Sequence, residues 1–263
     1  MEDAITRSPT KPIIPSPSGR QRLGAFYDRM APLYDLWVEL FETKARRRAE
    51  EILNIQSAKT LLEVAIGPGR HFIRLAQNTG LKMSVGMDLS SRMLKRADRR
   101  LKRTRGINVH LCRGDAIALP FRDGGFDRVL SCYMLDLLDE RDLFGVLAEF
   151  KRVLKATGKL VVINMAEQSP FFNRLWMSIY RHNPVLVGGC RPIEAAAIIE
   201  QCGWRILQHE EIRQSGFRSE LVSAKLQLRQ EVSGSQICRV NSVSLQSTMQ
   251  GFDDFSGIGI DRH

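Results

Sequence analysis

The chain reads LLEVAIGPGR from Leu61 to Arg70, an apolar run that meets an acid and then two closely spaced glycines. A short apolar run bounded by glycines predicts a buried β-strand. Gly67 and Gly69 carry no Cβ, so the backbone of this turn can approach a ligand closely. A helical pattern begins near Arg70, and the free N–H groups of that helix point to the same place. The stretch therefore predicts a ligand site where a strand gives way to a helix.

A second acid follows at a spacing that suits a nucleoside. Asp88 stands at the end of another apolar run, residues 83–87. An acid about 20 residues beyond such a glycine turn accepts hydrogen bonds from ribose hydroxyls. The dinucleotide fingerprint also requires a third glycine, and Phe72 occupies that place. These residues favour a ligand that contains a nucleoside, and they disfavour nicotinamide and flavin dinucleotides.

More motifs follow in the same order and spacing. Residues 112–116 read CRGDA after a third short apolar run, residues 119–121 read LPF, and residues 126–131 read FDRVLS as a fourth strand. With these motifs the chain resembles class I S-adenosylmethionine-dependent methyltransferases of the methyltransferase type 11 branch, over roughly residues 24 to 228. It is similar to the ubiquinone/menaquinone biosynthesis C-methyltransferases, which also carry Ala where Ala65 stands and most relatives have Gly.

The resemblance implies S-adenosylmethionine as the cofactor. Asp115 would bond the adenine amine, and the backbone N–H of Ala116 would meet the ring. The cofactor-binding residues that it implies are Glu63, Ala65, Gly67, Gly69, Asp88, Leu89, Asp115, Ala116 and Ser131. We therefore expect an α/β, Rossmann-like, doubly wound fold, whose mostly parallel seven-stranded sheet has an antiparallel last strand and helices on both faces.

Helical and strand patterns continue along the chain. Helices are expected over residues 70–78, from Ser90 as an N-cap, over 139–155 with Gly158 as a stop, and from Pro192 to Gln201. A buried strand is expected over 160–164, and an antiparallel pair over 204–212 and 217–228.

The domain is expected to span residues 21–228, between a disordered arm, 1–20, and a disordered tail, 229–263. Residues 21–52 resemble the helical lid of the quinone branch, in which Tyr27 and Tyr34 would face the substrate and help to exclude water. Residues 166–190 form an aromatic-rich helical insertion, which we expect over the site with Trp176 against an apolar substrate. Ordinary packing of these aromatic residues is the alternative.

Three residues near the expected carboxyl ends of strands are candidate proton acceptors: His71, Tyr133 and Asp136. His71 would stand at a helix N-terminus, whose dipole disfavours the imidazolium, so we expect a neutral ring that acts as a base or has a structural role. The Arg-Asn pair of the quinone branch is absent after the fourth strand. No Asn-Pro-Pro-Tyr tetrad stands there either, which disfavours methylation of DNA bases.

The net charge of +10 includes a dense basic run over residues 95–105. This run is either a solvated helix face or a contact for an anionic membrane. No aromatic residues interleave with it, which disfavours nucleic acid. The chain has no membrane-span pattern, no signal-peptide pattern and five cysteines without metal spacing. We expect a cytoplasmic protein without a metal, and peripheral membrane contact is the alternative.

Three functions of different class follow from these observations. The first is methyl transfer to a small apolar acceptor, quinone-like or polyketide-like. The second is methylation of a phospholipid or amine at a membrane surface. The third is a non-catalytic nucleoside-binding module, and the three acids Glu63, Asp88 and Asp115 argue against it. The sequence leaves the acceptor atom and the oligomeric state open.

Overall fold

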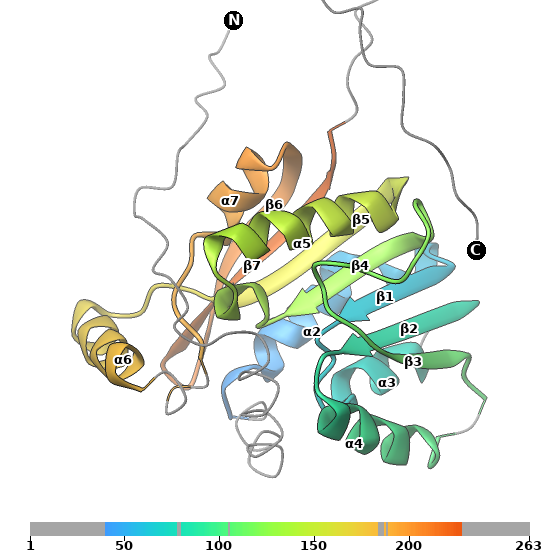
Figure 1. Cartoon of the computed structure of the whole chain (residues 1–263), viewed down its shortest axis with the longest axis horizontal. Coiled ribbons are helices and arrows are strands. Elements are labelled where there is room, and N and C mark those ends of the chain that lie inside the picture. The colour runs from blue at the N-terminus through green and yellow to red at the C-terminus, as the bar shows by residue number, and fades with distance from the viewer. Residues whose placement is uncertain (1–39, 78–79, 105, 184–186, 188, 228–263) are drawn as a thin grey trace, which may run out of the picture. The chain divides into compact units, whose positions relative to one another are not determined.

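A seven-stranded sheet forms the centre of the protein (Figure 1). The computed structural model describes residues 40–77, 80–104, 106–183, 187 and 189–227. The strands are β1 (Thr60–Val64), β2 (Met83–Asp88), β3 (Val109–Arg113), β4 (Phe126–Cys132), β5 (Leu154–Met165), β6 (Trp204–Gln214) and β7 (Phe217–Leu226). The helices are α2 (Thr43–Leu53), α3 (Arg70–Gln77), α4 (Ser91–Leu101), α5 (Glu140–Val153), α6 (Pro170–His182) and α7 (Ala195–Gln201), with short 3₁₀ turns η1 (Ile55–Ser57) and η2 (Leu135–Leu137).

The strand order is β3-β2-β1-β4-β5-β7-β6. Strands β1 to β5 are parallel, and β7 is antiparallel to both of its neighbours, β5 and β6. The expected Rossmann-like sheet with an antiparallel last strand is therefore confirmed. The order reverses between β1 and β4, and in such sheets ligands bind outside the carboxyl ends of the strands at this point.

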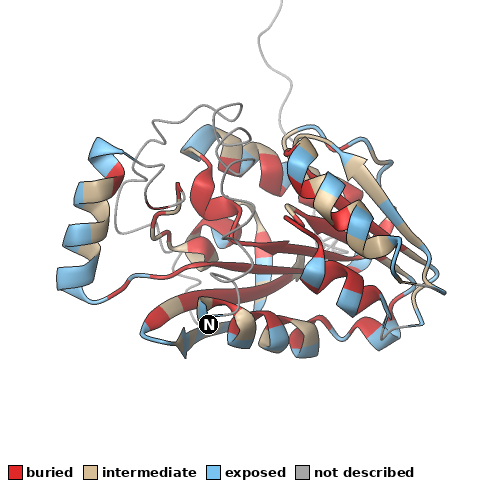
Figure 2. Cartoon of the chain, turned by 90° about the horizontal axis from the view of Figure 1, so that it is seen from below, coloured by how far each residue is buried: buried red, intermediate tan, exposed pale blue. Residues whose placement is uncertain are grey.

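Helices cover both faces of the sheet, as expected. The apolar stripes of α5 and α7 pack on one face, and those of α2 and α3 pack on the other. Figure 1 shows α5 in front of the sheet and α2 behind it. Because both faces are covered, the central strands read as nearly continuous apolar runs, and Figure 2 shows them buried.

Two element boundaries differ from the expectation. Strand β5 begins at Leu154, directly after α5, because Leu154 pairs with Phe126 across an irregular register, and Gly158 lies inside the strand. Helix α7 begins at Ala195 and not at Pro192. The carboxylate of Glu220 on β7 accepts hydrogen bonds from the backbone N–H groups of Ala195 and Ala196, at 2.8 and 3.1 Å. This cap comes from a distant strand, so local sequence does not reveal it.

The described part of the expected lid is a core helix. Residues 43–53 form α2, whose Ala49 and Leu53 are fully buried against the sheet. Residues 21–39, which include Tyr27 and Tyr34, lie outside the described residues, as do the expected arm, 1–20, and tail, 229–263. The part of the expected lid from residue 43 onward therefore packs on the sheet, and the lid itself stays a prediction.

Candidate functional site

A pocket, partly open to solvent, lies at the carboxyl ends of β1, β2 and β4. This is the point where the strand order reverses, and ligands bind at this point in sheets of this kind. The residues that line it are Val64, Ala65, Gly67, Met87, Asp88, Leu89, Ser90, Met93, Gly114, Asp115, Ala116, Cys132, Tyr133, Met134, Leu137 and Leu138.

The turn after β1 forms one wall of the pocket. The N–H groups of Ala65 and Ile66 donate to the carbonyl of Met87 at 2.8 and 3.1 Å, which ties the turn to β2. Ala65 and Gly67 have positive φ angles of 63° and 57°. The left-handed conformation costs an L-residue about 1–2 kcal/mol, so Ala65 holds a backbone conformation that Gly would adopt at a lower cost.

Gly69 has a different role from the one expected. It does not line the pocket, and a Cβ on it would lie 2.7 Å from the Cβ of Ala97 on α4. Its φ of +75° is also unfavourable for other residues. Gly69 therefore lets α3 and α4 pack closely, whereas Gly67 lets the backbone approach the ligand.

Asp88 is held rigidly at the end of β2. One carboxylate oxygen accepts a hydrogen bond from the N–H of Gly67 and the other accepts one from the N–H of Ser90, both at 2.8 Å. A carboxylate oxygen has two lone pairs, so each oxygen can accept a further hydrogen bond from a ribose hydroxyl. The structure therefore presents Asp88 to the pocket in a fixed orientation.

Asp115 and Ala116 follow β3 and line the pocket, next to Gly114. A carboxylate oxygen of Asp115 accepts a hydrogen bond from the N–H of Ile117 at 3.3 Å. A Cβ on Gly114 would lie 2.7 Å from the sulfur of Met87, so the floor of the pocket is already filled there. Two fixed acids separated by an apolar floor fit an adenosine group, with hydrogen bonds at the ribose and at the adenine edge.

Glu63 and Ser131 do not line the pocket, although the resemblance implied both. Successive side chains of a strand point to opposite faces, so Glu63 points away from the cluster that contains Leu62 and Val64. One Glu63 oxygen lies 3.4 Å from Nδ1 of His71, and the other has no hydrogen-bond partner among the described residues. The hydroxyl of Ser131 is also buried without a partner there. Both residues lie behind the wall of the site.

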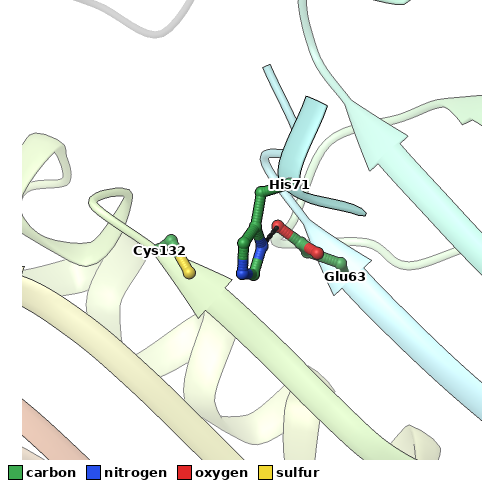
Figure 3. A group of neighbouring side chains, drawn as sticks. All are labelled: Glu63, His71 and Cys132. Atoms are coloured by element: carbon green, nitrogen blue, oxygen red, sulfur yellow. Dashed lines mark hydrogen bonds and ion pairs between the residues drawn. The ribbon is translucent and has the colours of Figure 1, made fainter. Parts of the chain in front are cut away.

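His71 lies between two carboxylates, as Figure 3 shows for Glu63. Its Nε2 is 3.0 Å from the carboxylate of Glu50, which also pairs with Arg74. Burial by itself would lower the pKa of His71, but Glu63 and Glu50 raise it above the ordinary value of 6.5. The two acids therefore favour the imidazolium, which is the opposite of the effect expected from the helix dipole, and a catalytic role for His71 stays a prediction.

Glu63, His71 and Cys132 also offer ligand atoms that lie within 4.8 Å of one another, so they satisfy one distance condition for a metal ion (Figure 3). Burial raises the pKa of the Cys132 thiol well above its ordinary value, which disfavours the thiolate that a metal requires. The geometry fits an ion pair between His71 and its carboxylates. The expected absence of a metal stays a prediction.

The other two candidate bases are engaged away from the pocket. The hydroxyl of Tyr133 is 2.7 Å from that of Ser219 on β7, and burial raises the pKa of the phenol well above 10. Asp136 is fully buried and accepts a hydrogen bond from the N–H of Met165 at 2.9 Å. Of these two, only Tyr133 borders the pocket. Asp136 fixes the segment after β4 to β5.

Sequence reasoning missed the apolar end of the pocket. Met134, Leu137 and Leu138 line it after β4, and the apolar run over residues 134–138 was the available signal. Trp176, in contrast, is absent from the lining, and its indole N–H donates to the carbonyl of Cys190 at 2.9 Å. The described part of the 166–190 insertion therefore contributes no lining residue.

Asp136 predicts a pH dependence of stability. Burial raises its pKa from 3.8 to about 7, against the opposing effects of the Met165 N–H and Arg191. The folded state then retains a proton that the unfolded state loses, so stability falls as the pH rises from about 4 to about 7. In urea unfolding at pH 5 and pH 8, Asp136→Asn should reduce this fall by about 2–4 kcal/mol.

The control for this experiment is Asp123→Asn, since the side chain of Asp123 is 80% exposed. It should leave the pH dependence of the free energy of unfolding unchanged. An Asp136→Asn variant with the wild-type slope would show that the folded state holds no extra proton at this carboxylate.

Comparisons with known proteins agree with this geometry. A family described as "Methyltransferase domain" matches residues 61–158. The demethylmenaquinone methyltransferase of Geobacillus kaustophilus is 33% identical over 171 residues, which are 64% of this chain and 70% of that protein. The one of Thermus thermophilus is 35% identical over 141 residues, 52% and 63% of the two chains. Among solved structures, the [4+2]-cyclase SpnF superposes with a TM-score of 0.65 at 18% identity, over 82% of this chain and 97% of that one, and shows the fold alone.

Proposed function

This chain belongs to the family of S-adenosylmethionine-dependent methyltransferases, and from that premise we propose that its acceptor is a small apolar quinol. The chain is a methyltransferase, and S-adenosylmethionine is its cofactor. When bound, this cofactor supplies a methyl group that its sulfonium already activates. Asp88 would hold the ribose, and Asp115 with the backbone of Ala116 would hold the adenine.

The observation that carries the acceptor class is the apolar end of the pocket. Besides the two acids, the lining includes the large apolar side chains of Met93, Met134, Leu137 and Leu138. A phosphorylated acceptor would require Arg or Lys, and the lining residues that the structure describes include neither. A cationic amine would require a carboxylate at this end, and the lining acids Asp88 and Asp115 are at the ends of β2 and β3. A neutral, apolar ring fits this wall better than either.

The absence of a strong base from the described lining also favours a quinol. The ionisable lining residues are Asp88, Asp115, Cys132 and Tyr133. The first two are assigned to the cofactor, and burial raises the pKa values of the last two. A quinol activates its own ring carbon through the adjacent hydroxyl, so the carbon gains the methyl group and its hydrogen leaves as a proton to solvent. The relatives named demethylmenaquinone methyltransferase support the same acceptor class.

The test is methyl transfer from tritiated S-adenosylmethionine to two acceptors, a prenylated naphthoquinol and a phosphatidylethanolamine. We expect label in the quinone fraction. Leu137→Asn should raise the KM for the quinol by about 10-fold or more, because a polar group in an apolar subsite removes binding energy of 1–3 kcal/mol. Its affinity for the cofactor in calorimetry should stay within a factor of about two, since Leu137 is beyond the acids that hold it.

The matched control is Leu207→Asn on β6, because Leu207 is exposed and does not line the pocket. It should change neither constant. Label in the phosphatidylethanolamine alone, or an unchanged quinol KM in Leu137→Asn, would contradict the proposed acceptor.

A further inference from the structure

Helix α6 carries an apolar stripe that the rest of the described chain leaves open. Phe171, Phe172 and Leu175 are 75%, 36% and 53% exposed. Leu175 follows Phe171 by four residues and Phe172 by three, so the three side chains share one helix face. The ring of Phe172 stacks on that of Trp176, with centroids 5.3 Å apart. Figures 1 and 2 show α6 at the left of both views, apart from the sheet, with mostly exposed and half-buried residues.

The row of residues next to this stripe is anchored on the rest of the chain. Tyr180 is buried, and the indole N–H of Trp176 donates to the carbonyl of Cys190. The hydroxyl of Ser169 accepts a hydrogen bond from the N–H of Phe172 and caps the N-terminus. The stripe is therefore held outward on an ordered helix.

The charges of α6 are of one sign. Arg174, Arg181 and His182 are exposed, and Pro170–His182 contains no Asp or Glu. In the part of the chain that the structure describes, neither Arg174 nor Arg181 forms an ion pair. Other surface arginines do, as Arg48 does with Glu210 at 2.8 Å and Arg152 with Asp123 at 2.7 Å. The two guanidinium groups beside the stripe are thus left for an anion supplied from outside.

We propose that α6 is an interfacial helix that docks the protein on an anionic phospholipid bilayer. An apolar face with Phe and Leu beside Arg residues is a composition that lies at the boundary between headgroups and acyl chains. The stripe enters the acyl boundary, and Arg174 and Arg181 meet lipid phosphates, each for about 1 kcal/mol near an anionic surface. In the described chain no helix is both long and apolar enough to span a membrane, and this mode of binding requires none. The inference does not depend on the identity of the methyl acceptor.

The basic run over residues 95–105 is a weaker membrane contact than α6. Helix α4 ends at Leu101, and its apolar residues Met93 and Ala97 are buried. Arg100 donates to the carbonyl of Pro68 at 2.6 Å, and Lys102 pairs with Asp98 at 2.7 Å. Without an exposed apolar stripe, α4 offers only electrostatic attraction, which salt screens.

The test is flotation of the full chain with phosphatidylcholine vesicles that contain or lack phosphatidylglycerol, at low and high salt. The wild type should float with the anionic vesicles and retain part of its binding at high salt. Phe171→Ser with Leu175→Ser should reduce the bound fraction by about 10-fold or more, because burial of each side chain contributes about 1.5–3 kcal/mol. Arg174→Gln with Arg181→Gln should weaken binding several-fold and remove its preference for phosphatidylglycerol.

The matched control is Arg99→Gln with Arg103→Gln, which removes two exposed cations near the end of α4 and should leave flotation nearly unchanged. The α6 variants should fold because the replaced side chains are exposed, and their melting temperatures will check this. The proposal is overturned if the wild type does not float, or if the Phe171 and Leu175 variant floats as well as the wild type. It is also overturned if only the α4 variant loses flotation. Loss of a concentration-dependent dimer in the α6 variant, without a change in flotation, would assign the stripe to a second copy of the chain instead.

Discussion

Asp88→Ala is expected to weaken S-adenosylmethionine binding by about 1–3 kcal/mol, or roughly 5- to 150-fold, in isothermal titration calorimetry. The substitution removes the acceptor for the ribose hydroxyls. It also leaves the N–H groups of Gly67 and Ser90 without the carboxylate that holds them at 2.8 Å. The turn after β1 and the start of α4 then lose their shared anchor, so the loss should reach the upper part of this range.

Two controls separate the binding site from general charge effects. Asp98→Ala removes an acid of α4 whose carboxylate pairs with Lys102 at 2.7 Å and does not line the pocket, so cofactor affinity should be unchanged. The wild type should not bind NAD, because Phe72 fills the place of the third fingerprint glycine and is buried in the core. Unchanged cofactor affinity in Asp88→Ala would remove this residue from the site.

Arg46→Ala is expected to lower the free energy of unfolding by about 3–5 kcal/mol, the largest loss of stability that we predict. Arg46 on α2 is buried, and its guanidinium is 2.7 Å from the buried carboxylate of Glu42. The guanidinium also lies 5.5 Å from the centre of the Tyr133 ring. Alanine would leave the Glu42 charge buried without its guanidinium and open a gap behind the end of β4. Denaturant unfolding of both proteins at one pH measures the difference.

The double variant Glu42→Gln with Arg46→Met should recover much of that loss, because it removes both charges and keeps the volume. Arg47→Ala, at the next and exposed position of the same helix, should change stability by less than about 0.5 kcal/mol. If Arg46→Ala unfolds at the same denaturant concentration as Arg47→Ala, the buried pair does not stabilise the fold.

A sequence motif predicts some residues of the pocket and does not predict others. Asp88, Asp115 and the turn at Gly67 could be predicted because each follows directly from the end of a parallel strand, where the backbone alone sets the direction of the side chain. Glu63, Ser131 and Gly69 belong to the same motifs but lie behind the wall. The alternation of side chains along β1 points Glu63 toward His71. Ala97 on α4 packs so close to Gly69 that a Cβ would not fit there. These placements depend on which face each helix covers.

The partners of the candidate bases also could not be predicted from the sequence, for a related reason. The dipole of α3 favours a neutral His71, but Glu50 comes from α2 and Glu63 from β1, and together they outweigh it. The hydroxyl of Tyr133 meets Ser219, which is 86 residues away in the sequence. Partners at such separations leave no local pattern.

The sequence by itself determined the order and type of the strands and helices, the antiparallel last strand, and the two acids, Asp88 and Asp115, that follow the second and third strands. Apolar periodicity and the glycine turn are local properties, and parallel connection of strands brings their carboxyl ends to one edge. Only the tertiary structure decided which polar residues face the pocket, which helix stripe is buried and which is exposed. The stripes of α2 and α6 are both apolar, but the sheet covers α2 and leaves Phe171 and Leu175 open. Burial is a property of the neighbours that an element meets, and periodicity specifies a face without specifying what covers it.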